Sequence, residues 1–279
     1  MLPFNPFNGP EHTDFTISGK KPAALLVHGF PGTPAEMRPL AKALNEHGWT
    51  VRGLLLPGFG SDLDTLPLRR AEDWTRAVRD ALLELRATHG PVMLIGNSMG
   101  AALSLRVVSQ ISIDGLVILA PFWRLSSIVW PLLPVLRWIF PFLKPFRLIK
   151  VDYQNLQIRK LFQRFFPRIN PDDPQDQQAM REFVLPIGMF DEIRRAGAAA
   201  YRAALQVRIP VLIVQGTQDE LAQVRMTRQL LKRYAGPVRY AEVLAEHNLL
   251  DATQPVWAQV RSLVLEFASR LELRPAPSS

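Results

Sequence analysis

The sequence contains no cysteine, which excludes disulfide bonds, thiolate metal sites and a cysteine nucleophile. Residues 1–10 hold no basic stretch followed by a long apolar run, so we expect no signal peptide. Internal repeats are absent, and the short tail at 274–279 is the one low-complexity segment. These absences are compatible with a cytoplasmic protein, which we expect here, and they leave peripheral contact with a membrane open.

No nucleic-acid-binding motif is present, although 33 Lys and Arg against 25 Asp and Glu give a formal net charge of +8. An excess of this size suits nucleic acid or an anionic membrane. The basic residues are not interleaved with aromatic residues in a recognisable module, so we expect no nucleic-acid partner. Most of the excess lies at 124–208, which contain 14 Lys and Arg and 7 Asp and Glu.

The 279 residues, 48% of them hydrophobic, suffice for one large α/β domain or for a domain with an insertion. Apolar runs typical of strands buried on both faces alternate with helical patterns. We expect strands at 13–19, 22–28, 49–56, 91–96, 115–120, 210–215 and 237–243, and helices at 33–48, at 71–88, after Ser98 and at 254–271. This alternation predicts a mostly parallel central sheet with helices on both faces.

The motif Gly96-Asn97-Ser98-Met99-Gly100 follows one of these apolar runs and precedes a helix-forming run. A strand, a sharp turn and a helix are the setting of a nucleophile elbow, in which the serine projects above the sheet edge. The turn strains the serine backbone, and side chains at the two glycines would collide with the adjoining strand and helix. Ser98 is therefore the predicted nucleophile, with a chance match to a short pattern as the alternative.

A serine hydroxyl is a weak nucleophile that needs a base, and the base needs an orienting acid. Proteins with this elbow place the serine first, the acid second and the histidine last in the chain. His247 is the one histidine that follows Ser98, and it lies directly after the last predicted strand. It is therefore the predicted base, and a surface histidine is the alternative.

The acid must also follow a strand end, and Asp219 comes just after the strand expected at 210–215. We expect Gly216 to allow the turn that aims this carboxylate inward. Glu220 and Glu246 are competing candidates. Capping of the next helix is the alternative role of Asp219.

A tetrahedral intermediate carries an oxyanion, which needs preorganised N–H donors. Met99, the residue after the predicted nucleophile, is expected to supply one of them. The loop after the first buried strand is expected to supply the second through Phe30, since Pro31 has no N–H. We expect His28 to brace this loop rather than to act as a base. This chemistry needs no metal ion or cofactor, and we expect none.

Together these segments resemble the α/β-hydrolase superfamily, and within it serine hydrolases of the monoacylglycerol lipase and carboxylesterase type. The matching segments, which span nearly the whole chain outside one insertion, are His28-Gly29-Phe30, Leu56-Pro57-Gly58-Phe59-Gly60, Gly96-Asn97-Ser98-Met99-Gly100, Gly216-Thr217-Gln218-Asp219 and His247. The resemblance implies hydrolysis of carboxylic esters, often of fatty acyl chains, through an acyl-enzyme. Phe59 and Asn97 stand where relatives often have histidine, and neither belongs to the predicted triad.

The same residues also suit a thioesterase, an acyltransferase, a perhydrolase or a carbon–carbon hydrolase. Epoxide hydrolases and haloalkane dehalogenases resemble this fold but use an aspartate nucleophile, which Ser98 argues against. A non-catalytic, membrane-associated binding protein is a further alternative, against which the complete triad argues. We therefore expect a serine carboxylic-ester hydrolase acting on a small-molecule apolar acyl ester, such as a monoacylglycerol or another lipid ester.

One segment, at 122–207, interrupts the alternation of strands and helices and is far longer than a plain connection. We expect a mainly helical cap there, inserted into an α/β-hydrolase core of residues 1–121 and 208–279. The part at 126–146 is rich in apolar and aromatic residues. Four prolines and two basic residues interrupt it, so we expect short broken helices rather than a membrane span.

The apolar faces of this cap suit three roles. They can form the core of the cap itself, line an acyl-chain pocket, or dock weakly on a lipid surface. For the pocket, the candidate substrate contacts are Trp130, Trp138 and Phe142. The excess of positive charge in the cap favours contact with a lipid surface, whereas a solvated helical surface is its alternative explanation.

Overall fold

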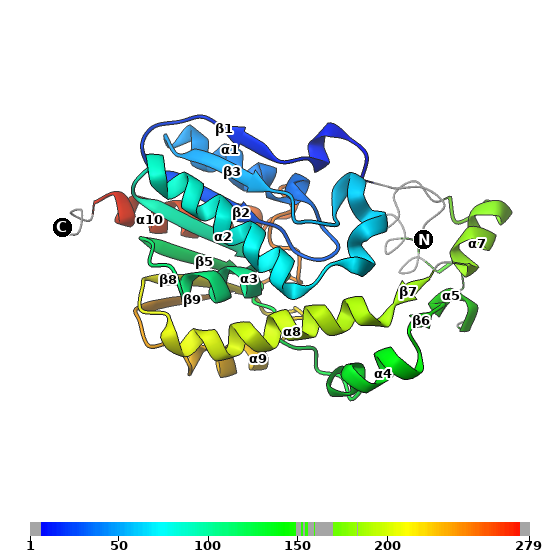
Figure 1. Cartoon of the computed structure of the whole chain (residues 1–279). Coiled ribbons are helices and arrows are strands. Elements are labelled where there is room, and N and C mark those ends of the chain that lie inside the picture. Colours follow the sequence, from blue (N-terminus) through cyan, green and yellow to red (C-terminus); the bar gives the residue numbers. More distant parts are fainter. Residues whose placement is uncertain are drawn as a thin grey trace.

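The computed structural model describes residues 7–148, 152, 154–155, 159, 170–182 and 184–273. Its centre is a seven-stranded sheet in the order β1-β3-β2-β4-β5-β8-β9 (Figure 1). The strands are parallel except for β1, which runs antiparallel to β3 at one edge. They are β1 (Phe15–Ile17), β2 (Ala23–Val27), β3 (Thr50–Leu54), β4 (Val92–Asn97), β5 (Gly115–Leu119), β8 (Val211–Gly216) and β9 (Val238–Val243).

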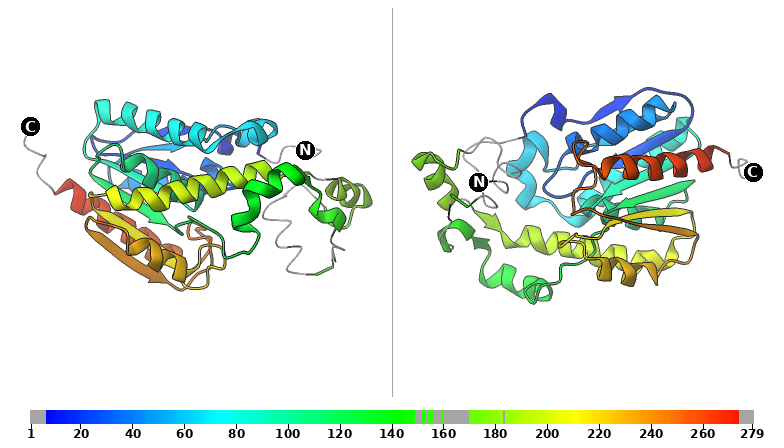
Figure 2. Two further views of the ribbon diagram at one scale, coloured as in Figure 1. Left: turned by 60° about the horizontal axis from the view of Figure 1, so that its bottom comes forward. Right: turned by 180° about the vertical axis from the view of Figure 1, so that it is seen from behind.

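Helices cover both faces of this sheet (Figures 1 and 2). One face carries α1 (Arg38–Glu46) and α10 (Trp257–Glu272), and the other carries α2 (Ala71–Thr88), α3 (Met99–Val108), α8 (Ile187–Ala203) and α9 (Val224–Leu231). Short 3₁₀ turns complete the core, namely η1 (Pro10–His12), η2 (Pro34–Met37), η3 (Gly60–Leu68) and η5 (Ala204–Gln206). The predicted mostly parallel sheet with helices on both faces is therefore confirmed.

Side chains of the central strands alternate between two hydrophobic cores, one on each face of the sheet. In β2, Leu25 packs into the core shared with α2, α3 and α8, and Leu26 packs into the core shared with α1 and α10. Leu94 and Ile95 repeat this pattern in β4, and all four side chains are fully buried. Because successive residues of a strand point to opposite faces, a strand covered on both faces must be apolar at every position.

One predicted helix is divided in two by the structure. The helix expected at 33–48 begins as η2 and continues as α1. The hydroxyl of Thr33 accepts a hydrogen bond from the amide of Ala35 at 3.4 Å, and Pro34 occupies the first position, where its missing N–H costs nothing.

The segment at 122–207 contains helices and one small sheet. It holds η4 (Trp130–Leu132), α4 (Leu133–Ile139), α5 (Pro145–Leu148), α7 (Pro174–Arg181) and α8, with β6 (Phe142–Leu143) antiparallel to β7 (Leu185–Pro186). Part of the predicted cap lies outside the described residues, at 149–151, 153, 156–158, 160–169 and 183. Within the described part of the chain, no helix is long and apolar enough to cross a membrane.

Helix α8 packs on the core although it lies within the predicted cap. Ile193, Ala196 and Ala200 belong to the same buried cluster as α2 and α3. Trp123 stacks on Tyr201 with ring centroids 4.1 Å apart. The division into core and cap stays a prediction, and α8 forms part of the helical layer beside the sheet.

Buried carboxylates at the start of α8 connect it to two other helices. Asp191 accepts a hydrogen bond from Arg137 of α4 at 2.9 Å. Glu192 accepts a hydrogen bond at 3.1 Å from the amide of Ala71, the first residue of α2, where the helix dipole favours negative charge. The side chains of Asp191 and Glu192 are only 3% and 8% exposed, so these contacts join α4, α8 and α2 inside the protein.

Close approach of α8 to the chain after β5 requires glycine at position 197. A methyl group at Gly197 would lie 2.2 Å from the carbonyl oxygen of Trp123, whereas one at Gly188 of the same helix would meet nothing within 4 Å. We expect Gly197→Ala to lower the free energy of unfolding by about 2 kcal/mol, because overpacking outweighs the better helix propensity of alanine.

Urea unfolding of the two alanine variants tests this prediction. Gly188→Ala is the matched control and should leave the stability unchanged or raise it by up to about 0.5 kcal/mol. Equal effects of the two substitutions would contradict the close packing of α8 against Trp123.

Candidate active site

Ser98 lies in the sharp turn between β4 and α3, with φ 51° and ψ −113°. A positive φ is unfavourable for a residue with a side chain, so the surroundings must hold it. The amide of Ser98 donates to the carbonyl of Leu119 in β5 at 2.9 Å, and its carbonyl accepts from the amide of Ala101 at 3.0 Å. The turn is thus fixed by the neighbouring strand on one side and by its own helix on the other.

The two glycines of the motif are required by close contacts between backbones. A methyl group at Gly96 would lie 2.5 Å from the carbonyl oxygen of Gly100. One at Gly100 would lie 2.2 Å from the carbonyl oxygen of Val27 in β2. Any side chain at either position would push α3 away from the sheet, as expected from the motif.

The structure brings the three residues of the predicted triad together from three separate loops. Nε2 of His247 lies 2.9 Å from Oγ of Ser98, and Nδ1 of His247 lies 2.7 Å from Oδ2 of Asp219. The carboxylate side chain is fully buried, and the imidazole is 14% exposed. These distances allow a proton to pass from the hydroxyl to an imidazole that a carboxylate orients.

Several donors fix the Asp219 carboxylate. Its Oδ1 accepts from the amides of Leu221 at 2.9 Å and Ala222 at 2.8 Å, which leaves Oδ2 directed at the imidazole. The competing acids Glu220 and Glu246 are both exposed. Asp219 does not cap the next helix, which was the alternative role, because α9 begins at Val224 with Gln223 as its N-cap. The carboxylate closes a local turn instead, and both of its oxygens are used.

Gly216 begins a turn that leads to Asp219, as expected, since its carbonyl accepts from the amide of Asp219 at 3.4 Å. The position is also closely packed, because a methyl group there would lie 2.5 Å from the carbonyl oxygens of both Ala245 and Glu246. The glycine therefore lets the loop that carries His247 approach the end of β8. Gln215 reinforces the same region, since its amide nitrogen donates to the carbonyl of Ala222 at 2.8 Å.

The loop at 28–32 lies directly beside Ser98. A methyl group at Gly29 would be 3.0 Å from Cβ of Ser98. The amide of Gly29 already donates to Oε1 of Glu36 at 2.7 Å, and Pro31 has no N–H. Phe30 is therefore the residue at 29–31 with an amide available for a ligand next to Ser98.

His28 braces this loop, as expected. Its Nε2 accepts from the amide of Leu56 at 3.1 Å, and its Nδ1 donates to the carbonyl of Gly29 at 2.9 Å. Burial lowers the pKa of His28 to about 4, and the hydrogen bond to Gly29 opposes that shift. A neutral imidazole with its proton on Nδ1 therefore connects the loops that follow β2 and β3.

Glu36 is a residue of the site that the sequence did not indicate. Its Oε1 also accepts from the side-chain amide of Asn97 at 2.9 Å, so one carboxylate oxygen joins the loop at 28–32 to the residue before Ser98. The pattern Thr33-Pro34-Ala35-Glu36 has the spacing of a helix capping box. That spacing predicts a local role, whereas the observed contacts are with the sheet edge.

An aromatic cluster lies next to Phe30. Its ring makes edge-to-face contacts with Phe59 at 6.2 Å and with Phe190 of α8 at 6.0 Å between centroids. Phe59 also makes an edge-to-face contact with His28, at 5.0 Å. Phe190 brings α8 to this loop, a contact that no sequence pattern indicates.

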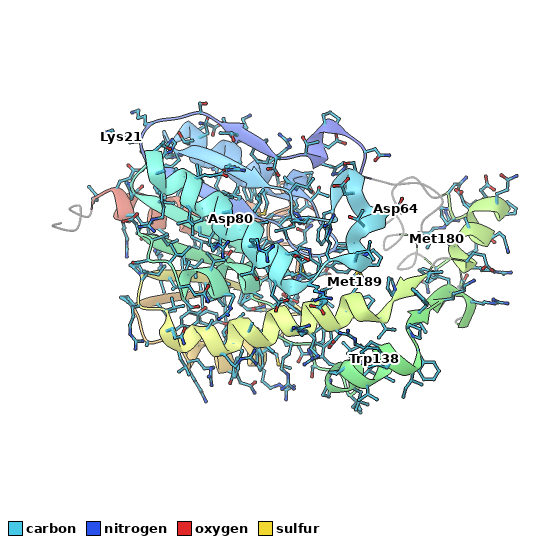
Figure 3. The ribbon with its side chains drawn as sticks, in the orientation of Figure 1. Lys21, Asp64, Asp80, Trp138, Met180 and Met189 are labelled. Carbon is cyan, nitrogen blue, oxygen red and sulfur yellow. The ribbon has the colours of Figure 1, made fainter. Side chains whose placement is uncertain are left out.

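The three cap residues predicted to contact substrate are not brought together. Trp130 is buried and makes an edge-to-face contact with Phe122 at 5.6 Å. Trp138 and Phe142 are 79% and 65% exposed, and Trp138 lies on α4, outside the sheet (Figure 3). Their contact with a substrate stays a prediction.

The architecture and the turn at Ser98 are those of the α/β-hydrolases, as the resemblance implied. The chain belongs to the family described as serine aminopeptidase, S33, whose model matches residues 19–248.

Two curated proteins with named activities are similar to parts of this chain. A carboxylesterase of Bacillus subtilis (strain 168) is 34% identical over 104 residues, which are 37% of this chain and 42% of that protein. A thermostable monoacylglycerol lipase of Bacillus sp. (strain H-257) is 38% identical over 81 residues, 29% of this chain and 32% of that protein. The matched segments thus span less than half of these curated relatives.

The likeness of the fold extends over most of the chain. A solved structure described under "LipS and LipT, two metagenome-derived lipolytic enzymes" superposes with a TM-score of 0.71 at 19% identity. The match covers 94% of this chain and 98% of that one.

The buried, neutral His28 predicts a loss of stability in acid. Unfolded protein takes up a proton on this histidine near its ordinary pKa of about 6.5, whereas folded protein does so only near pH 4. Since the unfolded state binds more protons in this window, the free energy of unfolding should fall as the pH drops from 7 to 4. The contribution of His28 should be up to about 3 kcal/mol.

Urea unfolding across this pH range, compared between wild type and His28→Gln, measures the contribution. His89→Gln is the control for loss of a histidine. If His28→Gln does not fold, ¹⁵N NMR of the wild-type imidazole decides the matter. A folded His28 that titrates near pH 6.5 would contradict the prediction.

Proposed function

We propose that the protein is a serine carboxylic-ester hydrolase that acts through an acyl-enzyme. The observation that carries this proposal is the continuous hydrogen bonding from Ser98 through His247 to Asp219, at 2.9 and 2.7 Å. A hydroxyl becomes a competent nucleophile when a base lies within hydrogen-bonding reach and a third group orients that base. Membership of a serine hydrolase family supports the same assignment.

In the proposed reaction, Oγ of Ser98 attacks the acyl carbon of the ester while Nε2 of His247 takes its proton. The buried Asp219 carboxylate holds the imidazole by its Nδ1–H and stabilises the imidazolium that forms. His247 then gives the proton to the departing alcohol as the acyl–oxygen bond breaks. A water molecule then attacks the acyl carbon and loses a proton to His247, which returns that proton to Oγ of Ser98 as the acyl–Oγ bond breaks and the acid departs.

The amides of Met99 and Phe30 are the proposed donors to the oxyanion. Met99 is the first residue of α3, so the helix dipole adds to the field of its N–H. Phe30 is supported by the engagement of the Gly29 amide with Glu36 and by the lack of an N–H at Pro31. In this assignment Glu36 positions the donor loop against Ser98 without touching the substrate.

The proposed substrate is a small-molecule apolar acyl ester, such as a monoacylglycerol or another lipid ester. A triad of this kind attacks both esters and the amides that the family description suggests. The names of the two curated relatives support the ester. The cap adds support, since several apolar side chains there are at least half exposed, namely Ile128, Val129, Val135, Trp138, Ile139, Phe140 and Phe142.

We further propose that this apolar surface of the cap, Ile128 to Phe142, associates weakly with anionic lipid surfaces. An exposed apolar surface in a basic segment favours binding at the interface of an anionic membrane. The exposure of Trp138 supports docking by this residue rather than burial in a closed acyl pocket.

A fluorophosphonate probe, which reacts with activated serines, should label the native protein and should not label Ser98→Ala. Ser109→Ala, at the other end of α3, is the control and should be labelled like wild type. His247→Ala should lower the kcat for ester hydrolysis by about 10³-fold or more, because the hydroxyl loses its base. Undiminished labelling of Ser98→Ala would rule the assignment out.

Hydrolysis of p-nitrophenyl esters should favour octanoate over acetate by about tenfold or more in kcat/KM, because each buried methylene adds binding energy.

Trp138→Ala should reduce co-sedimentation with phosphatidylglycerol vesicles while leaving acetate hydrolysis unchanged. Leu273→Ala, an equally exposed apolar side chain at the end of α10, is the control.

A steep preference for acetate would argue against the acyl substrate. Equal vesicle binding by the two alanine variants would argue against docking through the cap. Thioesters and monoacylglycerols assayed alongside separate the ester from the thioester as the preferred substrate.

A further inference from the structure

A cavity of about 520 Å³ lies between α2, α3 and α8, and it is separate from the triad. These three helices run side by side on one face of the sheet (Figures 1 and 2). Small side chains form part of the wall, among them Ala71, Ala196 and Ala199. Neither the triad nor the loop at 28–32 contributes to the lining, so the cavity has no role in the proposed hydrolysis.

Six of the 14 lining residues are arginines, and the lining includes a single carboxylate, that of Glu72. The arginines come from all three helices, namely Arg76 and Arg79 of α2, Arg106 of α3, and Arg194, Arg195 and Arg202 of α8. Like charges that converge on one concave surface repel each other and focus a positive potential within it.

Local carboxylates neutralise only half of this set. Arg79 pairs with its neighbour Asp80 at 2.8 Å, Arg194 with Asp191 at 2.8 Å, and Arg195 with Glu192 at 3.0 Å. The remaining three, Arg76, Arg106 and Arg202, have no carboxylate within 4 Å among the described residues.

The three unneutralised arginines come from three different helices and line one cavity. Arg76 and Arg202 are exposed and Arg106 is half-buried, so a ligand can reach these three side chains from solvent. The arrangement leaves three guanidinium groups without counter-ions at a single place. A bound anion would supply the missing negative charge.

Guanidinium groups bind phosphate oxygens through pairs of parallel hydrogen bonds, and arginine is preferred over lysine where such planar recognition matters. Thr75 and Gln110 add neutral polar side chains to the same lining. The volume lies within the range of small-molecule sites. A lining this rich in charge does not suit an acyl chain, so the cavity is no extension of a lipid pocket.

We propose that this cavity is a binding site for a phosphate group, held mainly by Arg76, Arg106 and Arg202. Either a soluble phosphorylated molecule or a lipid headgroup can carry such a group, and the two sources are separated by experiment. Binding does not depend on hydrolysis, so the proposal stands or falls independently of the function proposed for Ser98.

Isothermal titration calorimetry of the full chain with inorganic pyrophosphate and with glycerol 3-phosphate tests the proposal for soluble ligands. Co-sedimentation with phosphatidic acid vesicles tests it for a headgroup. We expect at least one of these probes to bind with a dissociation constant below about 1 mM, which is a modest affinity for three charge-assisted contacts. Sodium chloride at matched ionic strength controls for general screening.

Arg76→Gln/Arg202→Gln should weaken that binding at least tenfold, and Arg106→Gln should do so separately in case one variant fails to fold. Arg261→Gln, an exposed helical arginine of α10, is the matched control for loss of positive charge and should bind like wild type. Ser98→Ala should also bind like wild type, even if the hydrolase assignment fails.

Three results would overturn the proposal. The first is binding of none of the three probes. The second is an equal loss of binding in Arg261→Gln, which would indicate a general effect of charge. The third is an effect of sodium chloride as large as that of the phosphate probes.

Discussion

The turn at Ser98 is the constraint on which the candidate site depends. Its positive φ costs free energy that the flanking structure must offset, and both neighbouring strands contribute. Leu119 of β5 accepts the hydrogen bond of the Ser98 amide, and the chain around Val27 of β2 packs against Gly100 without room for a side chain. Such a turn is possible after β4 because this strand is central to the sheet and buried on both faces. The same parallel arrangement puts the ends of β4, β8 and β9 at one edge, where loops from distant parts of the chain meet.

Much of this arrangement can be predicted from the sequence, because buried parallel strands have a simple sequence pattern. Residues buried on both faces must be apolar throughout, so the runs that form β2, β4, β5 and β8 are recognisable without knowledge of their neighbours. The order of strands was not needed to bring Ser98, Asp219 and His247 together. Each follows the end of a strand, and all such ends of a parallel sheet lie on the same side. Histidine at a single position after the serine then left little choice for the base.

The features that the sequence did not indicate all depend on which surfaces meet. The spacing of Glu36 after Thr33 is that of a helix cap, yet its carboxylate joins Gly29 to Asn97, and Asn97 is 61 residues away. Gly216 begins the expected turn, and the approach of the loop that carries His247 is a second reason for a glycine there, which the sequence did not indicate. Apolar composition placed Trp130 and Trp138 in one class, although the first is buried and the second is exposed. Hydrophobicity indicates that a side chain gains from burial, and it does not say which partner will bury it. Strands as short as β6 and β7 give no periodicity at all.

The charged side chains of α8 and its neighbours fall into two groups, those that form buried ion pairs and those that do not. Asp191 and Glu192 are buried, and they bind Arg137, Arg194 and Arg195 together with the first amide of α2. An uncompensated buried carboxylate would be costly, so these two acids commit the arginines beside them to structural contacts. Asp191 and Glu192 are engaged in these contacts, and Arg76, Arg106 and Arg202 form no ion pair among the described residues. Arg76, Arg106 and Arg202 line the hollow between α2, α3 and α8, whereas the loops around Ser98 are braced by the Glu36 carboxylate and by the neutral His28. The basic hollow and the hydrogen-bonded triad thus have no side chain in common.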